Sequence, residues 1–191
     1  LNKLVDKNYI NSSERNRHSV VSIILPQSIN ISKYVLTLSK KAVQNAIAHG
    51  WNFRVKTHPS LTKSDVTTLL KEYDMKNECL KETQESMESL LPRTSVIVTS
   101  ASSTAIEAIC LGIPVVAVGM PIDLDFNMLD YLPSSMWKIA FTDDDVDLRL
   151  NQWAICHPLA YEKRREIGRR VLSDLFGEDT KNSIQAYTKS L

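Results

Sequence analysis

Hydroxyl side chains gather at one point of the sequence where they could hold an anion. Residues 100–104 (SASST) follow a β-branched run and precede an apolar stretch with helical spacing. Backbone N–H groups at the start of a helix carry partial positive charge, and nearby hydroxyls add further donors. We therefore expect the hydroxyl-bearing residues of this segment to contact a phosphate group, namely Ser100, Ser102, Ser103 and Thr104.

One acidic residue stands inside the apolar stretch that follows. Glu107 lies between Ile106 and Ala108, in a segment that carries no other charge. A carboxylate at this point could accept hydrogen bonds from the two hydroxyls of a ribose, which is a common means of holding a nucleoside. Thr104 and Glu107 also match the spacing of a capping box, in which the glutamate only returns a hydrogen bond to the helix start. The sequence leaves both interpretations open.

A histidine follows another expected strand, at residues 51–57. His58 precedes Pro59, and a residue before proline is held extended. The imidazole could donate a hydrogen bond to a phosphate or transfer a proton, or it could be a surface histidine satisfied by local backbone. Arg54 and Lys56 share its face of the strand. They would place positive charge beside a diphosphate, although such a pattern is also typical of the solvated face of an edge strand.

Four expected strands position these groups. They lie at residues 19–25, 51–57, 95–99 and 114–118, and they alternate with helical patterns at 32–49, 64–73 and 102–111. This alternation indicates an α/β fold: a Rossmann-like, mostly parallel sheet with helices on both faces. Ligands of such sheets bind beyond the carboxyl ends of the strands. The residues that follow the first and fourth strands are therefore expected to line the same site, namely Pro26, Gln27, Ser28 and Gly119.

Weaker patterns complete the expected domain. They predict a short strand at 77–81, a helix at 83–91, an edge strand at 137–141 and helices at 143–153, 158–175 and 179–191. We divide the chain into a polar lead-in at 1–18, a Rossmann-like domain at 19–157 and closing helices at 158–191. The acidic cluster at 143–147 is expected to cap a helix, because acidic side chains are favourable there, and no metal site is expected.

Composition excludes several classes of protein. The 191 residues are 43% hydrophobic with a formal net charge of +1, which fits a globular domain and not a nucleic-acid-binding surface. Only 5 glycines occur, so glycine-rich nucleotide loops are excluded. Three widely spaced cysteines fit a reduced, cytoplasmic setting. The basic residues at 163–170 are expected on a solvated helix face. Peripheral association at the inner face of the membrane and binding of an acceptor are open alternatives.

Residues 95–118 (SVIVTSASSTAIEAICLGIPVVAV) resemble the donor-binding segment of GT-B glycosyltransferases: strand, Ser/Thr turn, helix with an E-A-x-x-x-G-x-P-V run, strand. The resemblance implies that Ser102, Ser103 and Thr104 meet the phosphates of the donor and that Glu107 holds its ribose. About forty residues earlier, 56–59 (KTHP) resembles the H-P element of bacterial surface-polysaccharide transferases. These include polysialyltransferase-like enzymes and CDP-glycerol glycerophosphotransferases, although the D-Y-S-S form of the latter is absent here.

The resemblance implies one half of a GT-B fold, the C-terminal donor-binding domain of an inverting, metal-independent glycosyltransferase of bacterial surface polysaccharide biosynthesis. A UDP- or CMP/CDP-linked sugar would be its substrate, with no other cofactor. His58 would be catalytic, stabilising the departing phosphate with the helix start at 102–104. An N-terminal domain would bring the carbohydrate acceptor and the catalytic base. The alternatives are a CDP-glycerol-type polyol-phosphate transferase, half of a sugar-nucleotide 2-epimerase, and a non-catalytic Rossmann-like module. The E-A-x-x-x-G-x-P-V run is also found in the epimerases.

Overall fold

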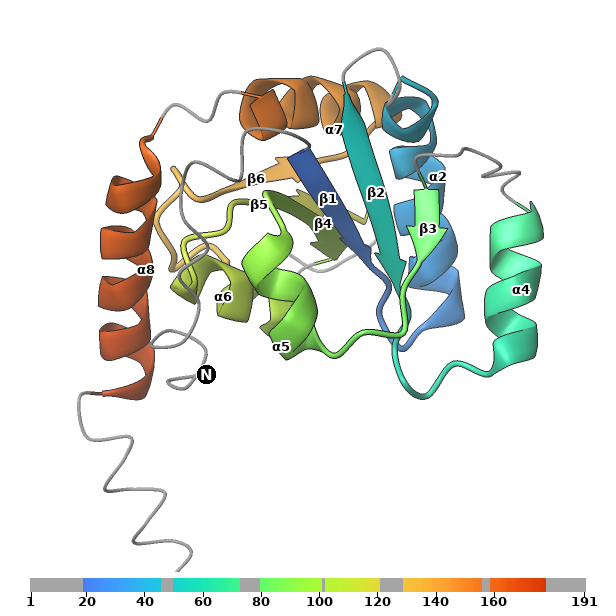
Figure 1. Cartoon of the computed structure of the whole chain (residues 1–191), viewed down its shortest axis with the longest axis horizontal. Coiled ribbons are helices and arrows are strands. Elements are labelled where there is room, and N and C mark those ends of the chain that lie inside the picture. The colour runs from blue at the N-terminus through green and yellow to red at the C-terminus, as the bar shows by residue number, and fades with distance from the viewer. Residues whose placement is uncertain are drawn as a thin grey trace, which may run out of the picture.

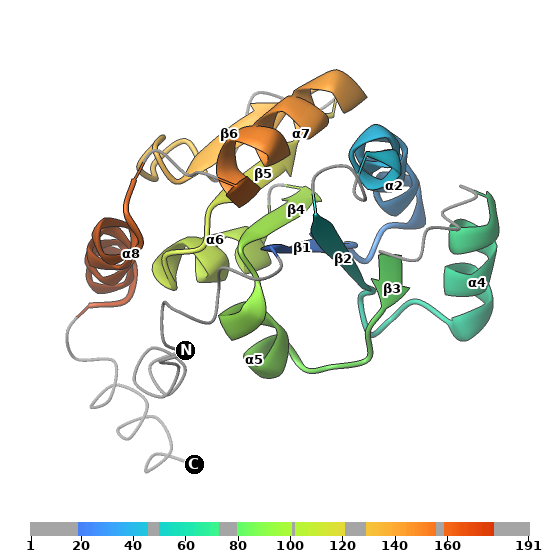
Figure 2. The same ribbon diagram turned by 45° about the horizontal axis from the view of Figure 1, so that its top comes forward.

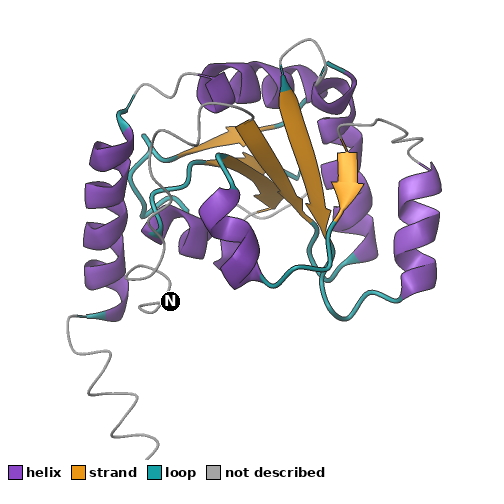
Figure 3. Cartoon of the chain, in the orientation of Figure 1, coloured by secondary structure: helices purple, strands orange, loops and turns teal. Residues whose placement is uncertain are grey.

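The structure is a computed structural model of the 191-residue chain, and it describes residues 19–45, 50–72, 80–100, 102–120, 129–155 and 159–177. Within these residues, strands form a central sheet and helices lie on both of its faces (Figures 1 and 3). The expected lead-in at 1–18 and the expected last helix at 179–191 lie outside the described residues.

All strand pairs of the sheet are parallel. The strands are β1 (Ser19–Ile24), β2 (Trp51–Lys56), β3 (Leu80–Glu82), β4 (Val96–Ser100), β5 (Val115–Val118) and β6 (Trp137–Ala140). Their order is β3-β2-β1-β4-β5-β6. This is the order of doubly wound nucleotide-binding sheets, in which the winding direction reverses between the first and fourth strands. The predicted α/β, Rossmann-like fold class is confirmed.

Helices connect the strands from β1 to β5, and further helices follow β6. They are α2 (Ile29–Gln44), α4 (Lys63–Glu72), α5 (Met87–Leu90), α6 (Ser103–Cys110), α7 (Asp143–Leu150) and α8 (Tyr161–Phe176), with a 3-10 turn η1 (Leu91–Arg93) and a π-helical turn η2 (Asn151–Ile155). Helices α2 and α7 cover one face, and α5 and α6 cover the other, with α8 packed on α6 (Figure 2). No helix in the described ranges has the length and apolar character needed to cross a membrane.

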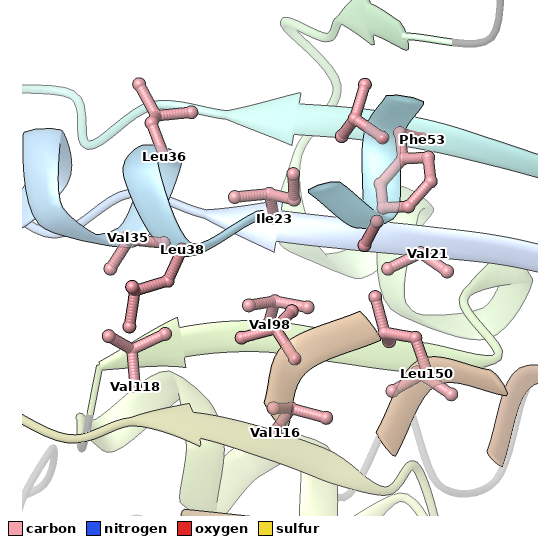
Figure 4. Close-up of a cluster of buried hydrophobic side chains, with 14 of the residues drawn as sticks. Val21, Ile23, Val35, Leu36, Leu38, Phe53, Val98, Val116, Val118 and Leu150 are labelled. Atoms are coloured by element: carbon pink, nitrogen blue, oxygen red, sulfur yellow. The ribbon is translucent and has the colours of Figure 1, made fainter. Parts of the chain in front are cut away.

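Two hydrophobic clusters hold the layers together, one on each face of the sheet. In the first, Val21, Ile23 and Val98 from the strands meet Val35 and Leu38 from α2 (Figure 4). Alternate residues of the same strands point to the opposite cluster, on the α5 and α6 side. Strands buried on both faces read as continuous apolar runs, which is why these were recognisable in the sequence.

Several element boundaries differ from the predictions. Helix α2 begins at Ile29, three residues earlier than predicted, because Ser28 is its N-cap and accepts from the Ile31 N–H. Helix α5 begins only at Met87, because Ser86 caps it. Strand β2 is not an edge strand, since β3 pairs along its other side. The expected edge position of β6 is confirmed.

Helix α8 approaches α6 closely because a glycine stands at the contact. A Cβ atom on Gly168 would lie only 2.5 Å from the carbonyl oxygen of Cys110 and 2.7 Å from that of Ile109. Real Cβ atoms essentially never come so near a backbone atom. The backbone of α6 is therefore fixed against α8 over its last turn.

The sequence predicts that the basic residues of α8 lie on a solvated face, but one of them is buried. Lys163 and Arg170 are exposed and form ion pairs with Glu166, at 2.8 and 3.5 Å. Arg165 is buried, with its guanidinium carbon 5.8 Å from the centre of the Tyr161 ring. Part of this positive charge is therefore neutralised or packed within the protein.

Candidate functional site

The predicted site residues follow strands whose carboxyl ends lie at the same edge of the sheet. Strand β1 pairs with β2 up to Ile24 and Lys56, and β4 pairs with β5 up to Ser100 and Val118. Neighbouring strands in a sheet lie about 4.8 Å apart. The segments that begin at Pro26, at His58 and after Ser100 therefore leave the sheet side by side, and the segment at Gly119 follows one strand further along.

Hydrogen bonds tie the ends of the three central strands together. The Thr99 hydroxyl donates to the carbonyl oxygen of Ile24 at 2.9 Å, across the junction of β4 and β1. The Leu25 N–H donates to the carbonyl oxygen of Lys56 at 2.8 Å, which joins β1 to β2. The first junction is the point where the winding of the sheet reverses, and ligands of such sheets bind there.

Ser102 caps helix α6 in an unusual way. Its backbone is extended, with φ −151° and ψ 164°, and its carbonyl accepts the first helical hydrogen bond, from Ala105 N–H at 3.0 Å. The side chain makes no capping hydrogen bond, and its Oγ atom is buried without any partner. A buried polar atom normally has a partner, so an unpaired hydroxyl at a helix start marks a place where a ligand atom can complete the bonding.

The next two hydroxyl residues lie inside the first turn of α6. Ser103 is exposed and Thr104 is half-buried. The first N–H groups of an α-helix have no acceptor within the helix and carry partial positive charge. The N–H groups of Ser103 and Thr104 are in this position, next to the unpaired hydroxyl of Ser102. Together they form a set of hydrogen-bond donors suited to an anion.

The capping box predicted from Thr104 and Glu107 is absent from α6. The helix starts two residues earlier than such a box requires, because Ser102 is the N-cap and Ala105 occupies the third helical position. Glu107 is half-buried on the helix, and its carboxylate has no hydrogen-bond or ion-pair partner among the described residues. Of the two interpretations of Glu107, the structure therefore removes the capping one.

His58 is exposed at the tip of β2 and turned back onto its own loop. The carbonyl of His58 accepts from the Leu61 N–H at 3.0 Å, which closes a tight turn with Pro59 at its second position. Within this turn the ring atom Nδ1 lies 2.7 Å from the Ser60 hydroxyl and 3.2 Å from the Ser60 backbone nitrogen. From the sequence, Ser60 was only one of several candidate caps for the following helix, because a serine in a loop carries no functional signal of its own.

The remaining predicted residues take different places. Pro26 accepts from the Ser32 hydroxyl at 2.9 Å, which fixes the start of the loop. Gln27 is exposed, whereas Ser28 is engaged as the N-cap of α2. Lys56 is half-buried at the end of β2.

Gly119 is covered by an aromatic ring that the sequence analysis had not connected with it. A Cβ atom there would lie 2.4 Å from a ring carbon of Phe141 and 2.8 Å from the Ile139 side chain. Both of these side chains are substantially exposed, at 51% and 39%. Gly119 therefore contributes a flat, side-chain-free backbone beneath Phe141.

The acidic cluster at 143–147 caps helix α7, as the sequence predicts. Thr142 accepts from the Asp145 N–H at 3.1 Å, and the Asp145 carboxylate accepts from the Thr142 and Phe141 N–H groups at 3.2 Å. The hydrogen bonds from Phe141 and Thr142 hold the pKa of Asp145 below its ordinary value. Among the described residues, no group of three or more His, Cys, Asp or Glu side chains is placed to hold a metal ion.

Comparison with solved structures defines the class of fold. The chain superposes on S. aureus MnaA, in a structure with UDP, with a TM-score of 0.62 at 14% identity, over 100% of this chain and 51% of that one. A glycosyltransferase from Rickettsia africae matches with a TM-score of 0.64 at 9% identity, over 98% and 54%. A UDP-N-acetylglucosamine 2-epimerase matches with 0.57 at 14%, over 92% and 47%.

The chain thus has the fold of one half of the GT-B proteins, as the resemblance had implied. It spans about half the length of these three structures. Neither a protein-family model nor a curated protein sequence matches it. The likeness is one of fold.

Proposed function

We propose that this chain is the donor-binding domain of a glycosyltransferase and holds the phosphates of a nucleotide sugar at the start of α6. The observation that carries the proposal is the Ser102 Oγ atom, buried and unpartnered at a helix N-terminus. It stands beside the β1–β4 junction, where the sheet reverses its winding. Unpaired donors, a helix dipole and this junction are the three features by which such folds bind nucleotides.

Under this proposal Glu107 binds the ribose of the donor. Its carboxylate lies one turn beyond the helix start and is not engaged in capping. A carboxylate can accept a hydrogen bond from each of two adjacent hydroxyls, and a ribose presents such a pair. Phosphate at the first turn and ribose at the second would align the nucleotide along α6.

The proposed reaction transfers a glycosyl group to a carbohydrate acceptor with inversion and without a metal ion. Negative charge builds up on the nucleotide phosphate as the glycosidic bond breaks, and donors already aimed at that group lower the barrier. Here the donors are the start of α6 and the His58 imidazole. A second domain would supply the acceptor site and the base that activates the acceptor hydroxyl. The segments that resemble bacterial surface-polysaccharide transferases support this assignment, with UDP or CMP/CDP as the carrier.

Nucleotide titration tests the proposal directly. Calorimetry of the 191-residue chain with UDP, CMP, CDP and GDP should show binding with one preferred base. Absence of binding by all four at millimolar concentration would overturn it. Replacing Glu107 by alanine should weaken nucleotide binding about tenfold or more, the range for a hydrogen bond to a charged group, and leave inorganic pyrophosphate binding unchanged. Glu162→Ala, an exposed helical acid on α8, is the matched control and should leave both unchanged.

A second candidate is half of a sugar-nucleotide 2-epimerase, and the match to a UDP-N-acetylglucosamine 2-epimerase favours it. Both candidates use the same nucleotide site, so binding alone does not separate them. The full-length parent protein is needed for that purpose. Conversion of a UDP-sugar without any acceptor would identify an epimerase, whereas consumption that depends on an added carbohydrate acceptor would identify a transferase.

A further inference from the structure

We infer that Ser60 is a positioning residue that keeps the ring proton of His58 on Nε2. The inference rests on the proposed function in one respect, since His58 is there assigned to the departing phosphate. It concerns a residue that the sequence pattern does not mark. Its basis is the pair of contacts that Ser60 makes with a single ring nitrogen.

The Ser60 backbone supplies one of two donors that together favour an unprotonated Nδ1. Its N–H points at Nδ1 of His58 with a nitrogen–nitrogen distance of 3.2 Å. A backbone N–H is always a donor, so Nδ1 must present its lone pair. A neutral imidazole with an accepting Nδ1 carries its proton on Nε2.

The Ser60 hydroxyl supports the same arrangement. Its Oγ atom lies 2.7 Å from Nδ1, and it acts as a donor there because Nδ1 has no proton to give. The tight turn that contains Pro59, closed by the Leu61 N–H, keeps Ser60 next to Nδ1. Two donors from one residue therefore meet the same lone pair.

The consequence for chemistry is a division of roles between the two ring nitrogens. Nδ1 is occupied from within the loop, whereas the exposed ring offers an Nε2–H donor outward. Such a donor can bind a phosphate oxygen. It cannot remove a proton from an acceptor hydroxyl, because that requires an Nε2 lone pair. The geometry thus assigns His58 to the leaving group and not to the role of general base.

Nuclear magnetic resonance on the free chain tests this without any ligand. Long-range proton–nitrogen spectra of the 191-residue chain, with its histidines labelled with nitrogen-15, distinguish a protonated ring nitrogen from an unprotonated one. The variant His58→Gln identifies the His58 signals among those of the 4 histidines. We expect the Nε2–H form in the unmodified chain, an increased Nδ1–H form in Ser60→Ala, and recovery in Ser60→Thr. Ser64→Ala, whose hydroxyl contacts Thr62 instead, is the control and should change nothing.

Affinity for UDP and CMP provides the second measurement. Loss of one neutral hydrogen bond shifts the equilibrium between the two ring forms about threefold to tenfold. Ser60→Ala should weaken nucleotide binding by at most that factor, in proportion to the fraction of the Nε2–H form that is lost, and Ser60→Thr should restore it. Unchanged ring protonation in Ser60→Ala, or an affinity that does not follow the measured loss of the Nε2–H form, overturns the inference and spares the proposed function if nucleotides still bind to the unmodified chain. A shifted ring proton in a chain that binds neither nucleotide overturns the proposed function and leaves the role of Ser60 in fixing the ring proton established.

Discussion

Replacing Ser102 by alanine should make the free protein more stable and the nucleotide complex weaker. The Oγ atom of Ser102 is buried, and no described residue replaces the hydrogen bonds with water that it loses on folding. An unsatisfied buried group of this kind costs about 1–3 kcal/mol. Its removal leaves the bond from the Ala105 N–H to the Ser102 carbonyl unchanged.

The expected gain is about 1 kcal/mol in the free energy of unfolding, the lower end of that range, because a small cavity replaces the hydroxyl. For a chain of this size the corresponding rise in Tm is about 2–4 °C. Affinity for UDP or its preferred relative should fall about tenfold or more, since the lost bond joins a hydroxyl to a charged phosphate. Urea unfolding gives the first quantity and calorimetric titration the second.

Thr142→Ala is the matched control at another helix start. The Thr142 hydroxyl does accept the hydrogen bond that caps α7, from the Asp145 N–H at 3.1 Å. Its loss should lower stability by about 1 kcal/mol and leave nucleotide affinity unchanged. The two N-cap substitutions should therefore change stability in opposite directions. A loss of stability in Ser102→Ala equal to that in Thr142→Ala would refute the reasoning about the unpaired hydroxyl.

Three further outcomes are expected. Gly168→Ala should destabilise the fold by about 1–3 kcal/mol, because the new methyl group meets the backbone carbonyl of Cys110. Gly119→Ala should destabilise it less, because its methyl group meets the exposed Phe141 ring. Urea unfolding compares the two variants. Burial raises the pKa of the Cys110 thiol to about 11, so its tryptic peptide should remain unalkylated at neutral pH until the chain unfolds. The pKa of Asp145 is lowered, mainly by the Phe141 N–H, so its contribution to stability is present above its ordinary value of 3.8 and is lost as the pH falls below it. Unfolding from about pH 5 to about pH 2 should show this dependence, and Asp145→Asn should reduce it.

The sheet was predictable because most of its strands are continuous apolar runs that are easily recognised in the sequence. Apolar, β-branched runs such as 19–25 and 114–118 admit few other structures when helices separate them. Strand β3 was placed too early, and its pairing with β2 was not foreseen. Only 3 residues form it, none of them fully buried, so its sequence shows neither an apolar run nor a clear alternation.

The edge of the sheet that carries the candidate residues was predictable, whereas the arrangement of their side chains was not. The order of strands and helices alone puts Ser100, His58 and Pro26 at one edge. The sequence does not reveal which of the consecutive hydroxyl residues caps α6, because Ser102, Ser103 and Thr104 are all able to do so. That choice decides whether Glu107 is a capping residue. It depends on how the chain leaves β4, which is a property of the packed sheet.

The hydrogen bond between Thr99 and Ile24 spans 75 positions of the chain, and this separation has a consequence for folding. Strand β1 gains its second neighbouring strand only when β4 is present. Closing so long a loop loses chain entropy before the contacts between the two strands can stabilise it. The edge that carries the proposed site therefore forms late, together with the sheet. Under the proposed function, a chain ending before β4 would lack the nucleotide site, so binding would also report completion of the fold.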